Sequence, residues 1–249
     1  MQIIISPAKK MNCDIDSFPC RGLPPLLSQT EQLFTQLRTM SYANLKELWH
    51  CNDQIAALNF ERLHTLDLHK QLTPAILSYD GIQYRYMAPS VFTDKQLTYV
   101  SEHLRILSGF YGILHPFNGV IPYRLEMQAK LEGDNFRNLY EFWGNTIAKY
   151  LLAETKIIVN LASKEYSRCI SNYLPENIIF LTCIFGKLKD GKIIEKGTQC
   201  KMARGEMVRY MAEKEIEEIS DLKNFDRLGY FFSPEQSDKS TYVFLTNHP

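Results

Sequence analysis

The chain alternates between short, almost wholly apolar runs and longer segments in which apolar residues recur every three or four positions. The short runs are rich in β-branched and aromatic residues and are bounded by turn formers, which predicts strands. They occupy residues 2–5, 156–161, 178–185, 192–196, 229–232 and 242–245. The longer segments have the spacing of amphipathic helices. They occupy residues 28–37, 43–49, 53–66, 94–107, 139–152 and 204–219.

Local signals mark where several helices and turns begin and end. Ser28 and Thr93 each have a Glu or Gln three residues later, which is the capping-box pattern of a helix start. Gly109 follows the helix expected after Thr93 and stands where a left-handed C-cap belongs. Asp190-Gly191 separates two predicted strands and indicates a hairpin turn, because this pair tolerates positive φ.

Residues 73–86 carry a shorter pattern. Thr73-Pro74 predicts the start of a helix, with threonine as N-cap and proline in the first turn. This helix is short because Gly81 closes it, and Tyr84-Arg85-Tyr86 then predicts an extended stretch.

The order of the elements indicates the fold class. Helices cluster in residues 28–152 and strands from residue 156 onward, which favours α+β over a regular βαβ alternation. No long linker, repeat or low-complexity segment interrupts the pattern. We therefore expect one domain over residues 1–249, with a mixed β-sheet surrounded by helices.

Charge narrows the choice of partners. The chain has 28 Lys and Arg against 28 Asp and Glu, so any attraction to nucleic acid must come from a local patch. One such patch lies in residues 187–209, where seven basic residues face three acidic ones. It can recognise phosphates, or it can be an ordinary solvated hairpin and helix face.

The remaining composition points to a cytoplasmic protein. No run of eighteen apolar residues predicts a membrane helix, and the first residues lack the basic lead of a signal peptide. The six cysteines are scattered without a C-x-x-C pair, as expected for reduced thiols. The six histidines form no metal-binding motif, so we expect neither a metal site nor a cofactor.

The segment with the richest candidate chemistry spans residues 104–127. It combines three glycines and two prolines with an apolar framework around Tyr123, Arg124 and Glu126. A segment bound to the core carries such charges only if they find partners. The pattern therefore indicates either a buried turn with a satisfied ion pair or a binding site.

Other polar residues follow predicted strands, where binding sites are common. Lys9 and Lys10 follow the first strand, and Ser163 to Tyr166 follow the strand that contains Asn160. Ser163 alone is better explained as a helix cap. Ala203-Arg204-Gly205 stands near a predicted helix start, where free backbone N–H groups and a guanidinium suit an anion.

Motifs along the whole chain resemble the YaaA family of peroxide-stress proteins, and they occur in that family's order. They read Ile5-Ser-Pro-Ala-Lys9, Leu104-Arg-x-Leu-Ser-Gly-x-Tyr-Gly-x-Leu114, Pro122-Tyr-Arg-Leu-Glu-Met127, Leu139-Tyr-x-Phe-Trp-Gly144, Asn160-Leu-Ala-Ser-x-Glu-Tyr166 and Ala203-Arg-Gly205. The resemblance implies a cytoplasmic bacterial protein with a single-domain fold that protects against hydrogen peroxide by limiting free iron. It also implies binding to duplex DNA through a positively charged cleft and a helix-hairpin-helix-like element.

Particular residues of the sequence are candidates for the contacts that this DNA binding would need. The helix over 94–107 and the turn after it are the candidate hairpin, in which Gly109 and Gly112 would let backbone N–H groups approach a phosphate. The candidate cations around it are Lys9, Lys10, Arg105, Arg124, Lys164, Lys201, Arg204 and Arg209. The family commonly has arginine where His115 stands and a second lysine where Met202 stands, so duplex affinity is expected to be salt-sensitive.

A second function of another class remains open: an enzyme or binding protein for a small anionic ligand such as a nucleotide. Lys9, Arg124, Asn160 and Arg204 would supply cations and an amide, and Tyr166 a ring or hydroxyl. The candidates for proton transfer are Tyr123, Glu126 and Glu165. A third interpretation treats all the motifs as fold determinants. The sequence favours a monomer and does not specify a reaction.

Overall fold

The structure, a computed structural model, describes residues 1–13 and 18–246. In this part of the chain one mixed sheet of eight strands forms the centre, in the order β11-β12-β9-β8-β1-β5-β6, with β10 paired to β9. The strands are β1 (Gln2–Ile5), β5 (Leu104–Ser108), β6 (Gly112–Leu114), β8 (Ile157–Leu161), β9 (Ile179–Lys189), β10 (Lys192–Ile194), β11 (Tyr230–Phe232) and β12 (Thr241–Thr246). The predicted mixed sheet with surrounding helices is confirmed.

The middle of this sheet is parallel and its edges are antiparallel. β1 pairs in parallel with both β5 and β8, and β8, β9 and β12 continue in the same direction. β6 and β11 close the two edges in antiparallel pairs. Ile3, Ile4 and Ile5 are fully buried, as expected for a parallel strand that is covered on both faces.

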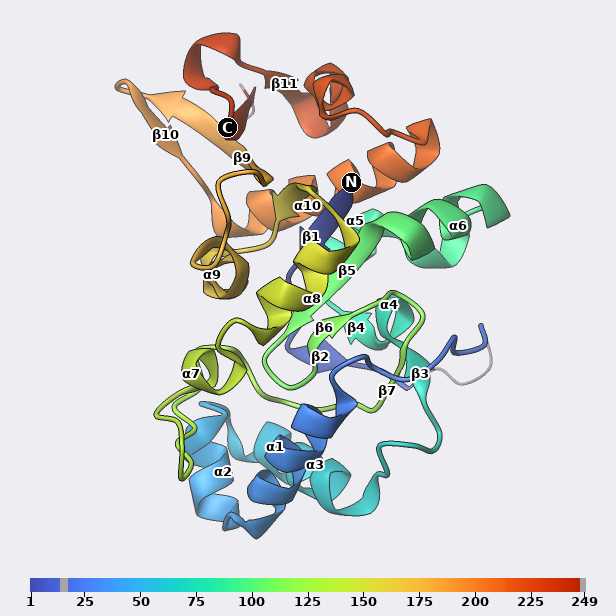
Figure 1. Ribbon diagram of the computed structural model, residues 1–249, viewed down its shortest axis with the longest axis vertical. Helices are drawn as coiled ribbons and strands as arrows, with labels where there is room; N and C mark the ends of the chain where they lie inside the picture. The colour runs from blue at the N-terminus through green and yellow to red at the C-terminus, as the bar shows by residue number, and fades with distance from the viewer. Residues whose placement is uncertain (14–17, 247–249) are drawn as a thin grey trace.

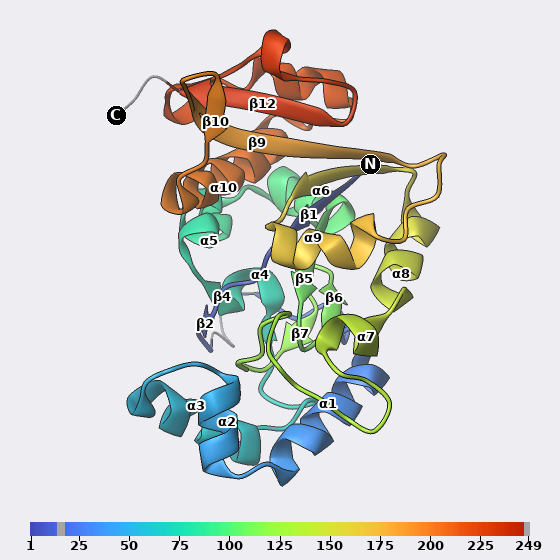
Figure 2. The same cartoon turned by 90° about the vertical axis from the view of Figure 1, so that its left-hand side faces the viewer.

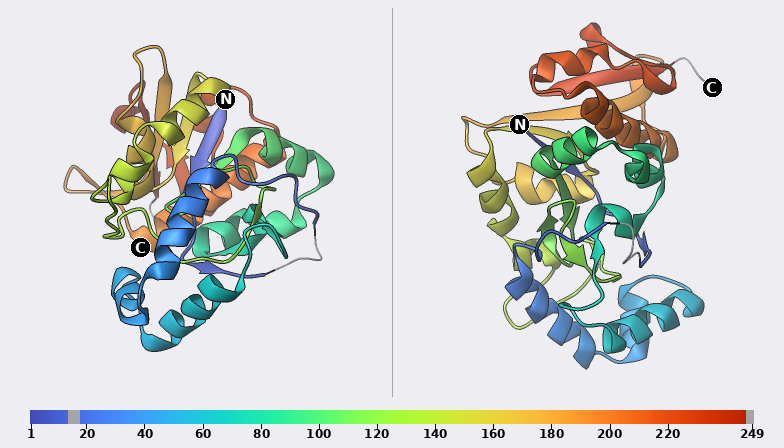
Figure 3. Two further views of the ribbon diagram at one scale, coloured as in Figure 1. Left: turned by 60° about the horizontal axis from the view of Figure 1, so that its bottom comes forward. Right: turned by 90° about the vertical axis from the view of Figure 1, so that its right-hand side faces the viewer.

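Helices pack on both faces of the sheet and at one end. Their bounds are α1 (Leu27–Thr39), α2 (Tyr42–Leu48), α3 (Asp53–Thr65), α4 (Ala75–Ser78), α5 (Ile82–Met87), α6 (Asp94–His103), α7 (Leu139–Trp143), α8 (Thr146–Glu154), α9 (Lys164–Ser171) and α10 (Gly197–Lys214). Figure 2 and the right-hand view of Figure 3 place α6 and α9 on opposite faces of the sheet. The helices α1 to α3 gather at the end opposite the C-terminal strands (Figure 1).

Short elements complete the described chain. Two small antiparallel ladders join β2 (Lys10–Met11) to β4 (Tyr79–Asp80) and β3 (Thr73–Pro74) to β7 (Gly119–Val120). Short 3-10 helices are η1 (Pro89–Val91), η2 (Ile219–Asn224), η3 (Arg227–Gly229) and η4 (Pro234–Gln236). No helix in residues 1–13 or 18–246 is both long and apolar enough to cross a membrane.

The strand order creates a crevice next to β1. From β1 the chain proceeds to β5 on one side, and it later returns to β8 on the other side. Both neighbours run parallel to β1, so the loops that leave β1 and β8 emerge at the same edge of the sheet. Ligands of parallel sheets commonly bind at the point where the strand order reverses, because the loops that leave the two neighbouring strands lead to opposite sides and leave a crevice between them.

The helix expected over 94–107 is wrong in its last turn. Thr93 does form the predicted capping box with Gln96, but the helix ends at His103 and Leu104–Ser108 form β5. Leu104 and Leu107 keep a helical spacing, yet pairing with β1 buries every residue of this segment. Gly109 consequently lies in the turn between β5 and β6 and caps no helix, so the helix-hairpin element is not confirmed.

Other boundaries also differ from the prediction. The helix expected over 139–152 is divided at Gly144, whose φ of 47° stops α7 before α8 begins. Ser28 lies inside α1 and does not cap it. The segment 84–86, expected to be extended, belongs to α5. The predicted hairpin turn at Asp190-Gly191 is confirmed, with φ of 50° and 73°.

Candidate functional site

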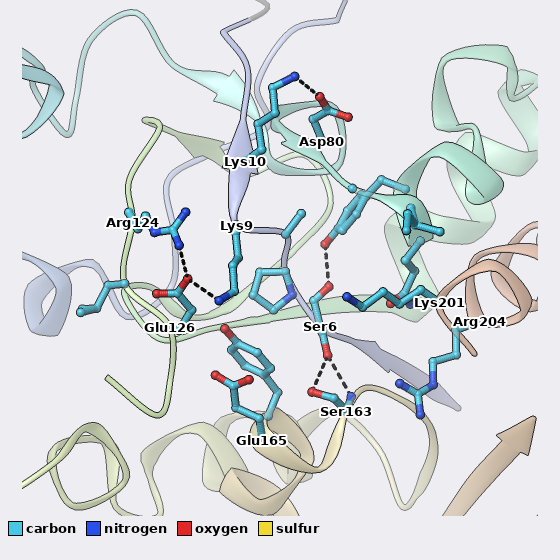
Figure 4. Close-up of a pocket in the computed structure, with 18 of the residues that line it drawn as sticks. Ser6, Lys9, Lys10, Asp80, Arg124, Glu126, Ser163, Glu165, Lys201 and Arg204 are labelled. Carbon is cyan, nitrogen blue, oxygen red and sulfur yellow. Dashed lines mark hydrogen bonds and ion pairs between the residues drawn. The ribbon is translucent and has the colours of Figure 1, made fainter. Parts of the chain in front are cut away.

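A pocket of about 400 Å³ opens at the ends of β1 and β8 (Figure 4). Five segments line it, and they are far apart in the sequence. They are residues 6–10 after β1, residues 80–84 at the start of α5, residues 123–126, residues 163, 165 and 166 at the start of α9, and residues 201 and 204 of α10. Loops after neighbouring parallel strands thus meet at one site, as the sequence predicted for the first strand and the strand with Asn160.

Ser6 and Ser163 join the two strand ends at the floor of the pocket. The backbone N–H of Ser163 donates to Oγ of Ser6 at 2.9 Å, and the Ser6 hydroxyl donates to Oγ of Ser163 at 3.3 Å. The Tyr84 hydroxyl donates to the carbonyl of Ser6 at 3.0 Å. These bonds fix the start of α9, whose first N–H groups have no acceptor within the helix and carry partial positive charge.

Lys201 and Arg204 extend from α10 into one side of the pocket (Figure 4). They are three residues apart and therefore share one face of the helix. The Arg204 side chain is 16% exposed and its ion pair with Glu195 is long, at 3.8 Å. Nε of Arg204 is buried and finds no acceptor in the described chain, in which Lys201 also forms no ion pair.

The predicted role of Ala203-Arg204-Gly205 at a helix start is wrong. The helix α10 begins at Gly197, so these residues lie in its interior, where their backbone N–H groups are used by the helix. Gly205 instead permits close packing, because a Cβ there would lie 2.1 Å from the carbonyl oxygen of Gln83 in α5. Only the guanidinium of Arg204 remains available to a ligand.

Glu126 lies on the other side of the pocket between two cations. Its carboxylate is 3.2 Å from Nζ of Lys9 and 3.3 Å from Nη2 of Arg124. The Arg124 side chain is 10% exposed, and its Nη2 also donates to the carbonyl of Trp49 at 3.4 Å. Arg124 and Glu126 thus form the ion pair of the first alternative and line a pocket as in the second. Nε of Arg124 and Oε1 of Glu126 are nevertheless buried without a hydrogen-bond partner in the described chain.

Glu165 is half-buried beside Glu126. Burial raises the pKa of the Glu165 carboxyl, and the negative charge of Glu126 raises it further, while a hydrogen bond from the N–H of Gln128 opposes both effects. Within residues 1–13 and 18–246, no cation lies within ion-pair distance of Glu165. A carboxyl in this setting can accept a hydrogen bond from a ligand or exchange a proton with it.

Of the two candidate tyrosines Tyr166 is buried and Tyr123 is partly buried, and both are neutral. The Tyr123 hydroxyl lies 2.9 Å from the hydroxyl of Tyr79 and 2.6 Å from that of Ser108, and burial raises the pKa of Tyr123 to about 12. Burial also raises the pKa of Tyr166 well above its usual value. Both phenols therefore stay protonated at neutral pH, so they supply hydrogen bonds and ring surface to the pocket.

Two polar residues singled out by the sequence lie outside the pocket and brace the sheet. Arg105 in β5 is 4% exposed and its Nε donates to the Glu154 carboxylate at 2.8 Å. Asn160 in β8 donates to the Thr182 hydroxyl at 3.3 Å and accepts from the N–H of Ala162 at 3.0 Å. Partners within the protein occupy both side chains.

The glycines of the expected hairpin also serve packing. Gly109 is buried, and its carbonyl accepts a hydrogen bond of 2.9 Å from Nε1 of Trp143. A Cβ at Gly112 would lie 2.8 Å from the Trp143 ring. The turn between β5 and β6 is thus enclosed by the protein.

Of the remaining predicted cations, one lies in the pocket and two lie outside it. Lys10 lines the pocket and pairs with Asp80 at 2.5 Å. Lys164 is exposed at the start of α9 and does not line the pocket. Arg209, in the last turns of α10, pairs with Glu213 at 2.7 Å.

Sequence reasoning missed the contribution of residues 80–84, at the end of β4 and the start of α5, to the site. Asp80, Gln83 and Tyr84 line the pocket, and Nε2 of the buried Gln83 finds no acceptor in the described chain. Residues 84–86 were expected to be extended after a short helix that closes at Gly81, whereas they belong to α5. The close approach of α5 to Gly205 positions it, and this long-range contact has no local signal.

Comparisons with known proteins are consistent along the whole chain. The family model described as peroxide stress protein YaaA matches residues 1–236. A UPF0246 protein of Lachnoclostridium phytofermentans is 55% identical over 245 residues, which cover 98% of this chain and 96% of the relative. A UPF0246 protein of Pediococcus pentosaceus is 51% identical over 247 residues, covering 99% and 98% of the two chains. This chain therefore belongs to the YaaA family of peroxide stress proteins.

Proposed function

We propose that this peroxide stress protein binds a small anionic ligand, such as a nucleotide, in the pocket at the ends of β1 and β8. The observation that carries the proposal is the weakly compensated cationic side of the pocket, where the only ion pair in the described chain is the long one between Arg204 and Glu195. Of its five cationic side chains, Lys9 and Arg124 share Glu126, and Lys10 faces Asp80. Of the remaining two, Lys201 has no ion pair in the described chain and Arg204 has only the 3.8 Å pair with Glu195, so both can bind an anion.

Unpartnered donors support the same conclusion. Nε of Arg204 and Nε2 of Gln83 are buried beside the pocket without an acceptor in the described chain. A buried polar group without a hydrogen bond costs about 1–3 kcal/mol, so such groups in a folded protein need an explanation. A bound phosphate or carboxylate would bring the missing acceptors after a small rotation of these side chains.

The size of the pocket favours a small ligand. Its volume of about 400 Å³ lies within the range of small-molecule and cofactor sites, roughly 300–1,000 Å³. Sequence-independent DNA binding requires only surface cations, whereas here the charges are set in apolar frames formed by five separate segments. The arrangement is therefore better matched to one compact anion than to a continuous backbone of phosphates.

The double variant Lys201→Ala with Arg204→Ala tests this function. We expect adenosine, guanosine, cytidine or uridine monophosphate to bind the wild type in isothermal titration calorimetry. The double variant should bind about 100- to 10,000-fold more weakly, because two charge-assisted hydrogen bonds are lost and each contributes roughly 1.5–3 kcal/mol.

A matched control removes the same charge elsewhere. Lys187→Ala with Lys189→Ala, on the exposed end of β9, should leave nucleotide affinity unchanged. The proposal is wrong if none of the four nucleotides binds the wild type, or if both double variants bind as the wild type does.

We propose duplex DNA as a second partner, on a different surface. The hairpin of β9 and β10 projects from the sheet (Figure 1), and it and the residues after it expose Lys187, Lys189, Lys192 and Lys196. Lysines at such a surface contact phosphates without reading bases. Contact of this kind would act in the cytoplasm and shield DNA from iron-driven damage during exposure to peroxide.

Salt dependence distinguishes this partner from the pocket ligand. Replacing the four hairpin lysines with glutamine should lower the salt slope of duplex binding by about 0.9 for each lost phosphate contact. Gel shifts over a series of salt concentrations measure the slope, and the pocket variant of Lys201 and Arg204 is the control. Wild-type protein that retains no DNA at low salt, or an unchanged slope in the glutamine variant, would rule out the hairpin as a DNA-binding surface.

A further inference from the structure

The pocket has two chemically different sides. Lys201 and Arg204 lie on one side of Ser6, and Glu126 and Glu165 lie on the other (Figure 4). A ligand long enough to cross the pocket would therefore meet positive charge at one end and carboxylates at the other. This separation of charge is more than the binding of a simple inorganic anion requires.

Glu165 is the carboxylate that a ligand can use. Lys10 and Arg85 hold Asp80, with N···O distances of 2.5 and 2.9 Å, while Lys9 and Arg124 hold Glu126. In the described part of the chain Glu165 has no such partner, and it accepts only backbone N–H groups. Its free acceptor capacity suits a hydrogen-bond donor on a ligand.

The walls between the two sides suit a flat ring. Pro7, Ala8, Ile82 and Leu125 line the pocket with apolar side chains, and the buried Tyr166 adds an aromatic surface. Small-molecule sites commonly combine such apolar walls with a few polar groups that fix orientation. An aromatic heterocycle satisfies this requirement better than a polar chain does.

We propose that the ligand is a nucleoside monophosphate whose base carries an exocyclic amine, with the phosphate at Lys201 and Arg204 and the amine donating to Glu165. This inference rests on the proposed anion-binding function and specifies its ligand class. The orphaned Nε2 of Gln83, which is 6% exposed, indicates independently that an acceptor-bearing ligand belongs here. Lys9 and Arg124 form ion pairs with Glu126. These two cations reduce the repulsion between the carboxylates of Glu126 and Glu165 on the side of the pocket where the amine would bind.

Matched pairs of nucleotides test the amine contact on the full-length wild type. Cytidine and uridine monophosphates differ by an exocyclic amine donor against a carbonyl acceptor, and guanosine and inosine monophosphates differ by one amine. In calorimetric titrations the amino member of at least one pair should bind about tenfold tighter or more, because its absence leaves a polar group of the site unpaired. Ribose 5-phosphate, which has no base, should bind more weakly than either member.

The variant Glu165→Gln identifies the residue responsible. In this variant the ratio of the two dissociation constants within a nucleotide pair should fall to less than half of its wild-type value. The affinity for ribose 5-phosphate should stay unchanged. Equal binding within both pairs overturns the inference while leaving the anion-binding function in place, and so does a preference that survives in Glu165→Gln. Failure of every nucleotide and of ribose 5-phosphate to bind overturns both.

Discussion

Replacing Gly205 with alanine is expected to destabilise the protein, although alanine normally strengthens a helix interior by about 1 kcal/mol relative to glycine. The added Cβ would lie 2.1 Å from the carbonyl oxygen of Gln83, and 3.0 Å from the backbone nitrogen of Met87. Both neighbours are backbone atoms that cannot rotate away, so α5 and α10 must separate. Overpacking of this kind costs about 1–3 kcal/mol or more, and each kcal/mol lowers the melting temperature by about 2–4 °C.

Gly197→Ala is the matched control for this prediction. Gly197 begins the same helix, and a Cβ there would meet nothing within 4 Å. Thermal unfolding should therefore show no loss of stability for Gly197→Ala and a clear loss for Gly205→Ala. Equal melting temperatures for Gly205→Ala and the wild type would mean that α5 does not approach α10 as closely as described, and that Gln83 is not fixed beside the pocket.

The second large effect is expected from Trp143→Ala. Trp143 is 1% exposed, its ring lies against Gly112, and its Nε1 donates to the carbonyl of Gly109. Truncating a buried tryptophan costs about 3–5 kcal/mol. Gly109 itself approaches the backbone of Leu125 so closely that a Cβ would lie 2.5 Å from the Leu125 oxygen. We therefore expect chemical denaturation to show the loss, together with weaker nucleotide binding through the displaced 124–126 segment.

Trp143→Phe separates packing from hydrogen bonding. Phenylalanine keeps most of the buried ring surface but leaves the Gly109 carbonyl without its donor, so its loss of stability should be smaller than that of the alanine variant. If alanine and phenylalanine destabilise equally, the hydrogen bond carries most of the effect. A loss below about 1 kcal/mol for alanine would contradict the packing described for this turn.

The limits of prediction from the sequence are visible at β5. Leu97, Val100, Leu104 and Leu107 keep a helical spacing through the end of α6 and into β5, so the local pattern alone extends the helix. The change to a strand is imposed by pairing with β1, about a hundred residues earlier in the chain. By contrast, β8 was predicted closely because its apolar run is continuous and bounded by turn residues. The start of β9 was also predicted closely, but the strand continues four residues beyond the predicted end at 185, to Lys189.

In the candidate site, too, some residues were predicted correctly from the sequence and others were not. Lys9 and Glu165 were found because polar residues follow buried strands, and parallel pairing brings such loops together. Arg105 and Asn160 looked equally suitable, but their partners Glu154 and Thr182 are distant in sequence and occupy them. A polar residue in an apolar run therefore indicates a need for partners, and only the fold decides whether a ligand or the protein supplies them.

The most direct test of the central claim is a crystal structure of the full chain grown with a saturating nucleoside monophosphate. The phosphate is predicted to lie within hydrogen-bonding distance of the Arg204 guanidinium, near the Ser6–Ser163 junction. Suppose that crystals grown with each of the four nucleotides all show an empty pocket, or show the phosphate bound on another face. Either result would contradict the assignment of this crevice as an anion-binding site.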